Sequence, residues 1–233
     1  MGEQVAIEVA GIGRIGGWAA RPGTAVRGAL VVVQEIFGVN AHMRAVADGY
    51  AREGYLALAP AFFDPVEPGV ELGYDEAGFR RGRELVGALG MDRAVAIAAA
   101  ADGWLRRELA GDDDAPDDGA RVGVVGFCWG GTVAYLANTR LGLPAVSYYG
   151  ARNVQYLDEA LRAPMMFHFG GQDASIKPAD VELHRAKHPN AAVHVYPAAG
   201  HAFNRDVDPK AYEPESARLA HRRTLELFED ALR

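Results

Sequence analysis

The sequence predicts a single, doubly wound α/β domain whose mostly parallel sheet is flanked by helices. Short apolar runs rich in β-branched residues, such as ALVVVQ (29–34), are typical of strands buried on both faces of a parallel sheet. Such runs alternate with segments of helical periodicity along nearly the whole chain. The chain has 233 residues, 49% of them hydrophobic, which is enough for one sizeable core. We therefore expect one domain over residues 1–233, without repeats or linkers.

The first half of the chain predicts four strands and two or three helices. A Gly-rich turn at 11–16 separates the first two strands, Gly54 ends the first helix, and Pro60 ends the fourth strand. In chain order we expect strands over 4–9, 17–21, 29–34 and 55–60, with helices over 41–54 and within 75–110.

The second half continues the alternation after a charged segment, DDDAPDDG (112–119). This segment is predicted to be a solvated loop, because it lacks the residue spacing of a calcium-binding EF-hand. After it we expect strands over 121–126, 143–150, 164–170 and 191–197, with helices over 129–140, 178–188 and 216–233.

Composition excludes several classes of partner. A net charge of −7 argues against nucleic-acid binding, which rewards clustered Lys and Arg. No apolar run approaches the ~18 residues of a membrane span, and the acidic N-terminus does not resemble a secretory signal. The single cysteine allows no intramolecular disulfide and favours a reducing, cytoplasmic compartment. No metal site is predicted: HRAKH (184–188) has the i, i+4 histidine spacing but lacks the Glu of H-E-x-x-H, so a solvated helix face is expected there.

One glycine pattern resembles a dinucleotide-binding motif. GIGRIG (11–16) follows a predicted strand, as that motif requires, and Glu35 stands roughly where the ribose-binding acid would be. A helix must follow so that its N-terminus faces the pyrophosphate, but Pro22 and Gly23 come too early for one. We therefore interpret GIGRIG as a hairpin turn and expect no nucleotide cofactor.

The other glycine pattern, GFCWGG (126–131), surrounds the only cysteine. A predicted strand precedes it and a predicted helix follows, which is the context of a nucleophile elbow with Cys128 in the place of serine. Side chains at Gly126 and Gly130 would collide across so tight a turn. The N-terminus of the helix favours a thiolate, and its N–H groups can bind an oxyanion. A buried structural cysteine is the alternative, but it leaves the flanking glycines unexplained.

A thiol nucleophile needs a base, and the base needs an acid to orient it. His201 lies in a Gly-containing loop after the strand at 191–197, whereas the other histidines fall on predicted strands or helices or near the start of the first helix. Asp173 follows the end of the strand at 164–170. The order Cys128, Asp173, His201 is the nucleophile–acid–base order of the α/β-hydrolase sheet, with each residue after the carboxyl end of a strand.

These residues carry a resemblance to a known family. The sequence resembles the dienelactone hydrolases (carboxymethylenebutenolidases) over nearly its whole length. The matching stretches are QEIFGVN (34–40), GFCWGG (126–131), SYYG (147–150), GGQD (170–173) and AGHAFNR (199–205). The resemblance implies an α/β-hydrolase fold and a cysteine-dependent ester or lactone hydrolase without metal or organic cofactor.

The resemblance also implies residue roles. Cys128 would be the nucleophile, His201 the base and Asp173 its orienting acid. Glu35 would contact the resting thiol and oppose its ionisation, because like charges disfavour one another; substrate binding would then turn Glu35 away. The alternative for Glu35 is a strand-end carboxylate paired with a nearby arginine. The backbone N–H groups of Ile36 and Trp129 would form the oxyanion hole.

Members of this family bind the carboxylate of their substrate with arginines. Arg205 matches one of these positions. The second arginine and a nearby tyrosine belong to the segment that reads GFRRGRE (78–84) here, where Phe79 and Arg83 align with them. Arg81, or one of its neighbours Arg80 and Arg83, is the expected substitute, and this departure bears on the substrate rather than on the chemistry.

The sequence therefore predicts a hydrolase that opens a small carboxylate-bearing enol-lactone, dienelactone, to maleylacetate through a Cys-His-Asp triad and an acyl-enzyme. A broader carboxylesterase or thioesterase on the same scaffold is the first alternative. A nicotinamide-dependent oxidoreductase that uses GIGRIG and a catalytically inactive binding protein are more remote ones. The sequence makes no prediction of oligomeric state or of preference between E and Z lactones.

Overall fold

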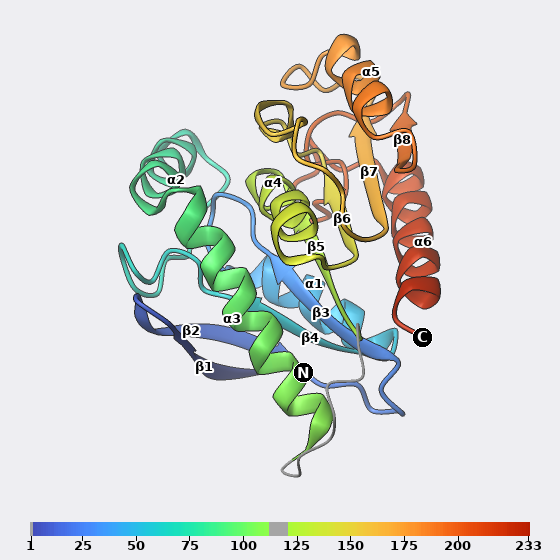
Figure 1. Ribbon diagram of the computed structural model, residues 1–233. Helices are drawn as coiled ribbons and strands as arrows, with labels where there is room; N and C mark the ends of the chain where they lie inside the picture. Colours follow the sequence, from blue (N-terminus) through green and yellow to red (C-terminus); the bar gives the residue numbers. More distant parts are fainter. Residues whose placement is uncertain (1, 112–120) are drawn as a thin grey trace. The chain divides into compact units, whose positions relative to one another are not determined.

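The computed structural model of the protein describes residues 2–111 and 121–233 (Figure 1). The described chain forms two compact units. Unit 1 comprises Met1–Gly123 with Leu232–Arg233, and unit 2 comprises Val124–Ala231. The loop predicted at 112–119 lies outside the described residues.

Unit 1 holds four strands in the order β1-β2-β4-β3. Their bounds are β1 (Glu3–Val9), β2 (Gly13–Ala20), β3 (Gly28–Val33) and β4 (Tyr55–Pro60). β1 pairs antiparallel with β2, and β2 antiparallel with β4, whereas β3 and β4 are parallel. Every residue of β3 and β4 is buried, as their uninterrupted apolar runs predict for strands covered on both faces.

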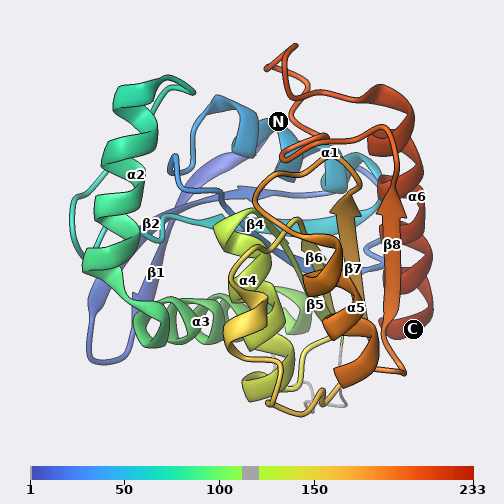
Figure 2. The same ribbon diagram turned by 90° about the horizontal axis from the view of Figure 1, so that it is seen from above.

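The helices of unit 1 are α1 (Ala41–Arg52), α2 (Glu76–Leu89) and α3 (Met91–Ala110). α1 and α3 cover opposite faces of the β3–β4 pair (Figures 1 and 2). Asn40 caps α1 by accepting a hydrogen bond from the backbone N–H of Met43, and Asp75 caps α2 in the same way. The predicted helices at 41–54 and within 75–110 are confirmed.

GIGRIG forms a hairpin turn, as predicted. Gly11 and Gly13 have φ angles of 73° and 108°, which favour glycine, and the Ile12 N–H donates to the Val9 carbonyl at 3.0 Å. The second strand, however, begins at Gly13 rather than at residue 17, so residues 13–16 of the motif belong to the strand. A strand follows the motif where a dinucleotide site requires a helix, which removes the physical basis for a phosphate site.

Unit 2 holds four parallel strands in the order β5-β6-β7-β8. The strands are β5 (Val122–Phe127, which begins in unit 1), β6 (Ala145–Tyr148), β7 (Met165–Gly170) and β8 (Ala192–Tyr196). The helices are α4 (Trp129–Leu136, continued by a π-helical turn over Ala137–Leu141), α5 (Pro178–Lys187) and α6 (Pro214–Ala231). α4 packs on β6 and α6 packs on β7 from the opposite face of the strands (Figure 2).

The prediction of a solvated face at HRAKH is wrong. His184 is 1% exposed and packs edge-on against Phe167 and Phe169, while His188 is 5% exposed and lies 2.8 Å from the Tyr135 hydroxyl. The segment covers the strands of unit 2, and two imidazoles with aromatic neighbours can be buried there as neutral rings. Periodicity alone does not separate such a histidine from a solvated one.

Candidate active site

Cys128 stands in a sharp turn between β5 and α4. Its backbone has φ 56° and ψ −118°, a conformation that costs energy for any residue with a side chain. Gly126 makes the turn possible, because a Cβ atom there would lie 1.9 Å from the carbonyl oxygen of Gly130. The strand–Cys–helix elbow expected from GFCWGG is therefore present, with the Gly126 position facing the backbone of Gly130.

The elbow is also anchored to the neighbouring strand. The Cys128 N–H donates to the Tyr148 carbonyl at 3.0 Å, and the Gly131 N–H donates to the Cys128 carbonyl at 3.0 Å. A Cβ at Gly131 would lie 2.7 Å from the Tyr148 carbonyl oxygen, so this glycine lets α4 approach β6 closely. The sulfur thus lies at the N-terminus of α4, where the helix dipole favours a negative charge.

The loops that carry Asp173 and His201 are joined by their backbones. The Gly171 N–H donates to the Tyr196 carbonyl and the Gln172 N–H to the Ala199 carbonyl, both at 2.8 Å. Gly170 permits this approach, because a Cβ there would be 2.5 Å from the Gly200 carbonyl oxygen. The GGQD and AGH stretches therefore form one local unit after β7 and β8.

The three side chains form a continuous relay. Asp173 Oδ2 lies 2.7 Å from His201 Nδ1, and His201 Nε2 lies 3.2 Å from Cys128 Sγ. The Asp173 side chain is fully buried, and its other oxygen accepts a hydrogen bond from the Ser175 N–H at 2.8 Å. The His201 side chain is 28% exposed, which leaves one side of the relay open. This is the geometry of a nucleophile, a base and an orienting acid.

Electrostatics favour a protonated His201. Burial alone would lower the pKa of its imidazole, but the charge on Cys128 together with hydrogen bonds to Asp173 and Cys128 raises the pKa of His201 to about 10. The His201 imidazole is thus held between the sulfur and a carboxylate, where it can donate and accept a proton.

Backbone strain is concentrated around this relay. Among the non-glycine residues in the described part of the chain, those with positive φ are Cys128 (56°), Tyr149 (40°) and Ala202 (60°). Ala202 directly follows His201, and the Tyr149 ring lies 4.9 Å from the His201 ring between centroids. Strained backbone of this kind persists where the surrounding structure holds functional groups in place.

Arg205 lies four residues after the histidine and is 3% exposed. Its Nη1 donates to Asp208 Oδ2 at 3.2 Å, and the arginine side chain taken alone is 4% exposed. Arg205 is therefore paired with a nearby aspartate, and its guanidinium is buried rather than on the surface.

In unit 1, Glu35 and Ile36 follow β3 in a loop whose shape is determined by close packing. Glu35 is 1% exposed and Ile36 is 9% exposed. A Cβ at Gly82 of α2 would lie 2.2 Å from the Ile36 carbonyl oxygen, so the helix lies directly against the loop. The Leu72 N–H donates to the Phe37 carbonyl at 2.9 Å, and the Phe37 ring packs on neighbouring aromatic side chains.

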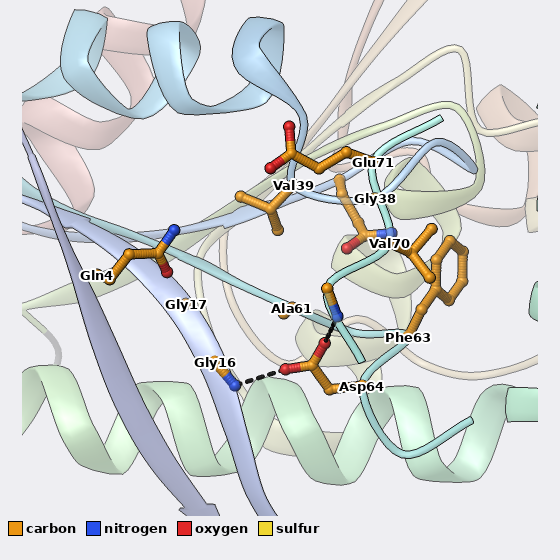
Figure 3. Close-up of a pocket in the computed structure, with 12 residues that line it drawn as sticks. Gln4, Gly16, Gly17, Gly38, Val39, Ala61, Phe63, Asp64, Val70 and Glu71 are labelled. Atoms are coloured by element: carbon orange, nitrogen blue, oxygen red, sulfur yellow. Dashed lines mark hydrogen bonds between the residues drawn. The ribbon is translucent and has the colours of Figure 1, made fainter. Parts of the chain in front are cut away.

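Beside this loop lies a small pocket with a volume of about 90 Å³ (Figure 3). Asp64 at its edge accepts hydrogen bonds from the N–H groups of Gly16 at 2.7 Å and Gly69 at 2.9 Å. Its remaining lining includes Gln34, Gly38 and Glu71. The volume is well below the roughly 300–1,000 Å³ of ordinary ligand pockets. We therefore assign Asp64 to joining β2 and the segment around residue 70 rather than to binding substrate.

Arg81 of α2 is engaged with two carboxylates. Its guanidinium bonds to Glu67, and to Glu84 at 2.9 Å, and its side chain is 44% exposed. The hydrogen bonds to Glu67 and Glu84 raise the pKa of the guanidinium. A role for Arg81 in binding a substrate carboxylate would require it to leave these partners.

Sequence reasoning missed two residues beside the relay. Tyr149 packs against His201, and its hydroxyl donates to Asn204 Oδ1. Both residues lie inside stretches that match the family resemblance, SYYG and AGHAFNR. Nothing in the spacing of a tyrosine and a distant asparagine indicates such a contact, so only the structure reveals it.

Residues 2–111 and 121–233 contain neither a candidate membrane span nor a candidate metal-binding cluster. No helix there combines the length and the apolar character needed to cross a membrane. No group of three or more His, Cys, Asp or Glu side chains in this part of the chain is placed to hold a metal ion.

Fold and site together define a class of protein. Parallel strands carry a strained strand–cysteine–helix turn, and the loops after β7 and β8 bring an aspartate and a histidine to the sulfur. This is the arrangement of an α/β hydrolase.

Comparison with known proteins specifies the class further. The model of the dienelactone hydrolase family matches residues 15–232, and the chain belongs to that family. It is 34% identical to the carboxymethylenebutenolidase of Pseudomonas sp. (strain P51), over 97% of this chain and 94% of that one. The Pseudomonas putida carboxymethylenebutenolidase is 32% identical, over 89% and 87%. The protein is therefore a carboxylic ester hydrolase.

Solved structures agree with this assignment. A Klebsiella pneumoniae protein given the provisional name dienelactone hydrolase superposes with a TM-score of 0.82 at 30% identity, covering 98% of both chains. The dienelactone hydrolase of Anabaena variabilis superposes with a TM-score of 0.67 at 20% identity, over 100% of this chain and 99% of that one, a level that supports the fold alone.

Proposed function

We propose that this protein opens a small, carboxylate-bearing enol-lactone by covalent catalysis with Cys128 as nucleophile, His201 as base and acid, and Asp173 as orienter. The observation that carries the proposal is the continuous relay that ends on a cysteine in a strained turn. His201 lies 2.7 Å from Asp173 Oδ2 on one side and 3.2 Å from Cys128 Sγ on the other. The substrate class comes from the family, whose relatives are named for hydrolysis of carboxymethylenebutenolide.

In the first half of the reaction, the thiolate of Cys128 attacks the lactone carbonyl carbon. The backbone N–H of Trp129, at the start of α4, stabilises the oxyanion that forms. When the tetrahedral intermediate collapses, the bond from the carbonyl carbon to the ring oxygen breaks. His201 gives its proton to the departing enolate, which becomes a ketone, and a thioester joins the acyl group to Cys128.

In the second half, water hydrolyses the thioester. His201, now neutral, takes a proton from the attacking water while Asp173 keeps its ring oriented. The thiolate leaves, the acid product is released, and the imidazolium forms again. For dienelactone the product is maleylacetate, and no metal or organic cofactor takes part.

The roles predicted for Glu35, Ile36 and Arg81 remain proposals that rest on the family resemblance. Glu35 would restrain the resting thiol, the Ile36 N–H would be the second oxyanion donor, and Arg81 would contribute to carboxylate binding. A cytoplasmic location also remains a proposal.

The test is steady-state kinetics on dienelactone beside p-nitrophenyl esters of short acids. We expect a higher kcat/KM for dienelactone than for the esters, with Asp173→Asn impaired and His201→Ala inactive. A chain that hydrolyses the esters efficiently and leaves dienelactone untouched would contradict the proposed substrate. If Asp173→Asn kept full activity, another carboxylate would have to hold the imidazole.

One observation favours a second candidate, a broader carboxylesterase. Arg81 is paired with Glu67 and Glu84, and by the family resemblance Phe79 and Arg83 stand where the family has its second arginine and a tyrosine. A site with fewer arginines available would discriminate less between anionic and neutral substrates. Equal kcat/KM values for the lactone and for a neutral ester would support this candidate.

A further inference from the structure

Tyr149 is held in a conformation that most residues avoid. It follows β6, is 1% exposed, and has a φ of 40°. Its N–H donates to the carbonyl of His168 on β7 at 2.8 Å, which fixes its backbone to the neighbouring strand. Strain of this kind is retained where it positions a functional group.

The turn beneath Tyr149 is built to keep it there. Asn153 donates through Nδ2 to the Ser147 hydroxyl at 3.2 Å, and both side chains are fully buried. A Cβ at Gly150 would lie 2.6 Å from Ser147 Oγ and from Asn153 Oδ1, so glycine is required between them. The turn after β6 is therefore rigid, although it carries no member of the relay.

The Tyr149 side chain contacts both His201 and the residues that follow it in the loop. Its ring lies 4.9 Å from the His201 ring between centroids, with an angle of 56° between the planes. Its hydroxyl donates to Asn204, three residues after His201, and its ring also packs edge-on against Phe203 at 5.6 Å. Both ends of the segment that carries the histidine thus contact one tyrosine.

We propose that Tyr149 is a positioning residue that holds the imidazolium of His201 between Cys128 and Asp173. The ring provides a surface that favours the cationic form, because an aromatic face attracts a cation. The hydroxyl, through Asn204, ties the histidine loop to the rigid turn after β6. This inference rests on the proposed function of the relay.

The two parts of the role can be separated by substitution. Tyr149→Phe keeps the ring and removes the bond to Asn204, and Asn204→Ala removes the same bond from the other side. Tyr149→Leu removes the ring as well. We expect kcat on a p-nitrophenyl ester to fall about 3–10-fold in Tyr149→Phe and in Asn204→Ala, with KM within about twofold, since a lost hydrogen bond of ordinary strength has this effect. The double variant should lose little more than either single one.

The effect of the Tyr149 ring on His201 is tested by a measurement that needs no substrate. Within the described part of the chain, His201 contacts Cys128, Asp173 and Tyr149. Nuclear magnetic resonance of protein with isotope-labelled histidine follows the His201 ring as pH rises, and the expected midpoint in the wild type is about 10. In Tyr149→Leu we expect the midpoint to fall by roughly half a pH unit, whereas Tyr149→Phe should keep it.

Tyr135→Phe is the matched control. Tyr135 is also fully buried in unit 2, and its hydroxyl donates to the Tyr156 carbonyl at 3.0 Å, but it has no contact with His201 among those described. It should lower the thermal midpoint of unfolding as Tyr149→Phe does, while leaving the titration of His201 and kcat unchanged.

The proposal is overturned if the His201 midpoint in Tyr149→Leu and the kcat values of Tyr149→Phe and Asn204→Ala all match those of Tyr135→Phe. Tyr149 would then only contribute to packing. Should Tyr149→Leu fail to fold, the other two variants still decide the question. If the protein failed to open dienelactone, the proposed substrate would be wrong, but the titration and ester kinetics would still test Tyr149.

Discussion

Arg205 combines almost complete burial with a carboxylate contact, to Asp208 at 3.2 Å. A buried guanidinium close to His201 in the sequence can bind a substrate carboxylate through a bidentate, charge-assisted pair. Arg205→Ala should then lower kcat/KM for the anionic lactone. The expected loss of transition-state stabilisation is roughly 1.5–3 kcal/mol, the usual contribution of a hydrogen bond to a charged group.

The measurement is the ratio of kcat/KM for the anionic lactone to that for a neutral ester, in the wild type and in Arg205→Ala. Because the neutral ester does not use the contact, its kcat/KM should change much less. Asp208→Asn serves as the control for the loop contact. An unchanged ratio in Arg205→Ala would mean that Arg205 only supports the loop and does not bind substrate.

At the residue scale, the relay was predictable because each of its members carries a local signal. Glycines stand on both sides of Cys128, and Asp173 and His201 each follow a strand in a Gly-containing loop. Tyr149 and Asn204 carry no such signal, because their contact joins positions 55 residues apart and depends on the shape of two turns. The burial of His184 and His188 was mispredicted for the same reason: exposure is decided by what a helix packs against.

At the scale of the element, the backbone conformation of the elbow depends more strictly on glycine at position 126 than on cysteine at position 128. The Cβ of Gly126→Ala would lie 1.9 Å from the Gly130 carbonyl oxygen, which belongs to backbone and cannot move without displacing α4. We expect Gly126→Ala to lower the free energy of unfolding by about 3 kcal/mol or more and to abolish activity, as severe overpacking does. Chemical denaturation followed by circular dichroism measures the first effect.

Gly87→Ala is the control for this prediction. Gly87 lies inside α2, and a Cβ added there would meet no atom within 4 Å, so alanine adds only helix propensity. This variant should be as stable as the wild type or more stable, by up to about 1 kcal/mol. Equal stability of both glycine variants would contradict the account of the elbow.

The elements themselves follow closely from the pattern of apolar residues. β4 has the predicted bounds, and β3 is displaced by one residue. β2 begins four residues earlier than predicted, because antiparallel pairing with β1 extends the strand through Gly13 to Gly16, into a motif that looks like a loop. Glycine-rich sequence can be strand where a partner strand supplies the hydrogen bonds.

At the scale of the whole molecule, buried histidines should make stability depend on pH. Burial, as the largest cause, lowers the pKa of His168, His184, His188 and His194, and for His168 it does so strongly. The unfolded chain takes up protons near pH 6.5, whereas the folded protein does not, so stability is present above about pH 6.5 and declines as pH falls below it.

We expect the thermal midpoint of unfolding to fall by roughly 5 °C or more between about pH 6.5 and about pH 5, a range in which His201, with its pKa raised to about 10, stays protonated in the folded protein. His194→Gln removes one half-buried histidine and should reduce this dependence without abolishing it. A midpoint that is constant over this range would show that these histidines titrate alike in the folded and unfolded states.

The fold class was predictable as a whole because alternation of buried strands and helices leaves few topologies open. The antiparallel β1–β2 hairpin at the start of the chain and the four parallel strands of unit 2 agree with the predicted, mostly parallel sheet. The choice of substrate was less predictable, since it depends on which arginines remain available, and the partners of Arg81 appear only in the structure.

The central claim, that Cys128 forms an acyl-enzyme, is tested most directly by intact-protein mass spectrometry during turnover of a p-nitrophenyl ester. Rapid acid quenching should trap the protein with the mass of one acyl group added. Peptide mapping should place that group on Cys128, and neutral hydroxylamine should remove it, as it does a thioester. Cys128→Ala, in which alanine fits the elbow, should stay folded, lose turnover by several orders of magnitude and acquire no adduct. An adduct on another residue, or near-normal turnover by Cys128→Ala, would contradict the account.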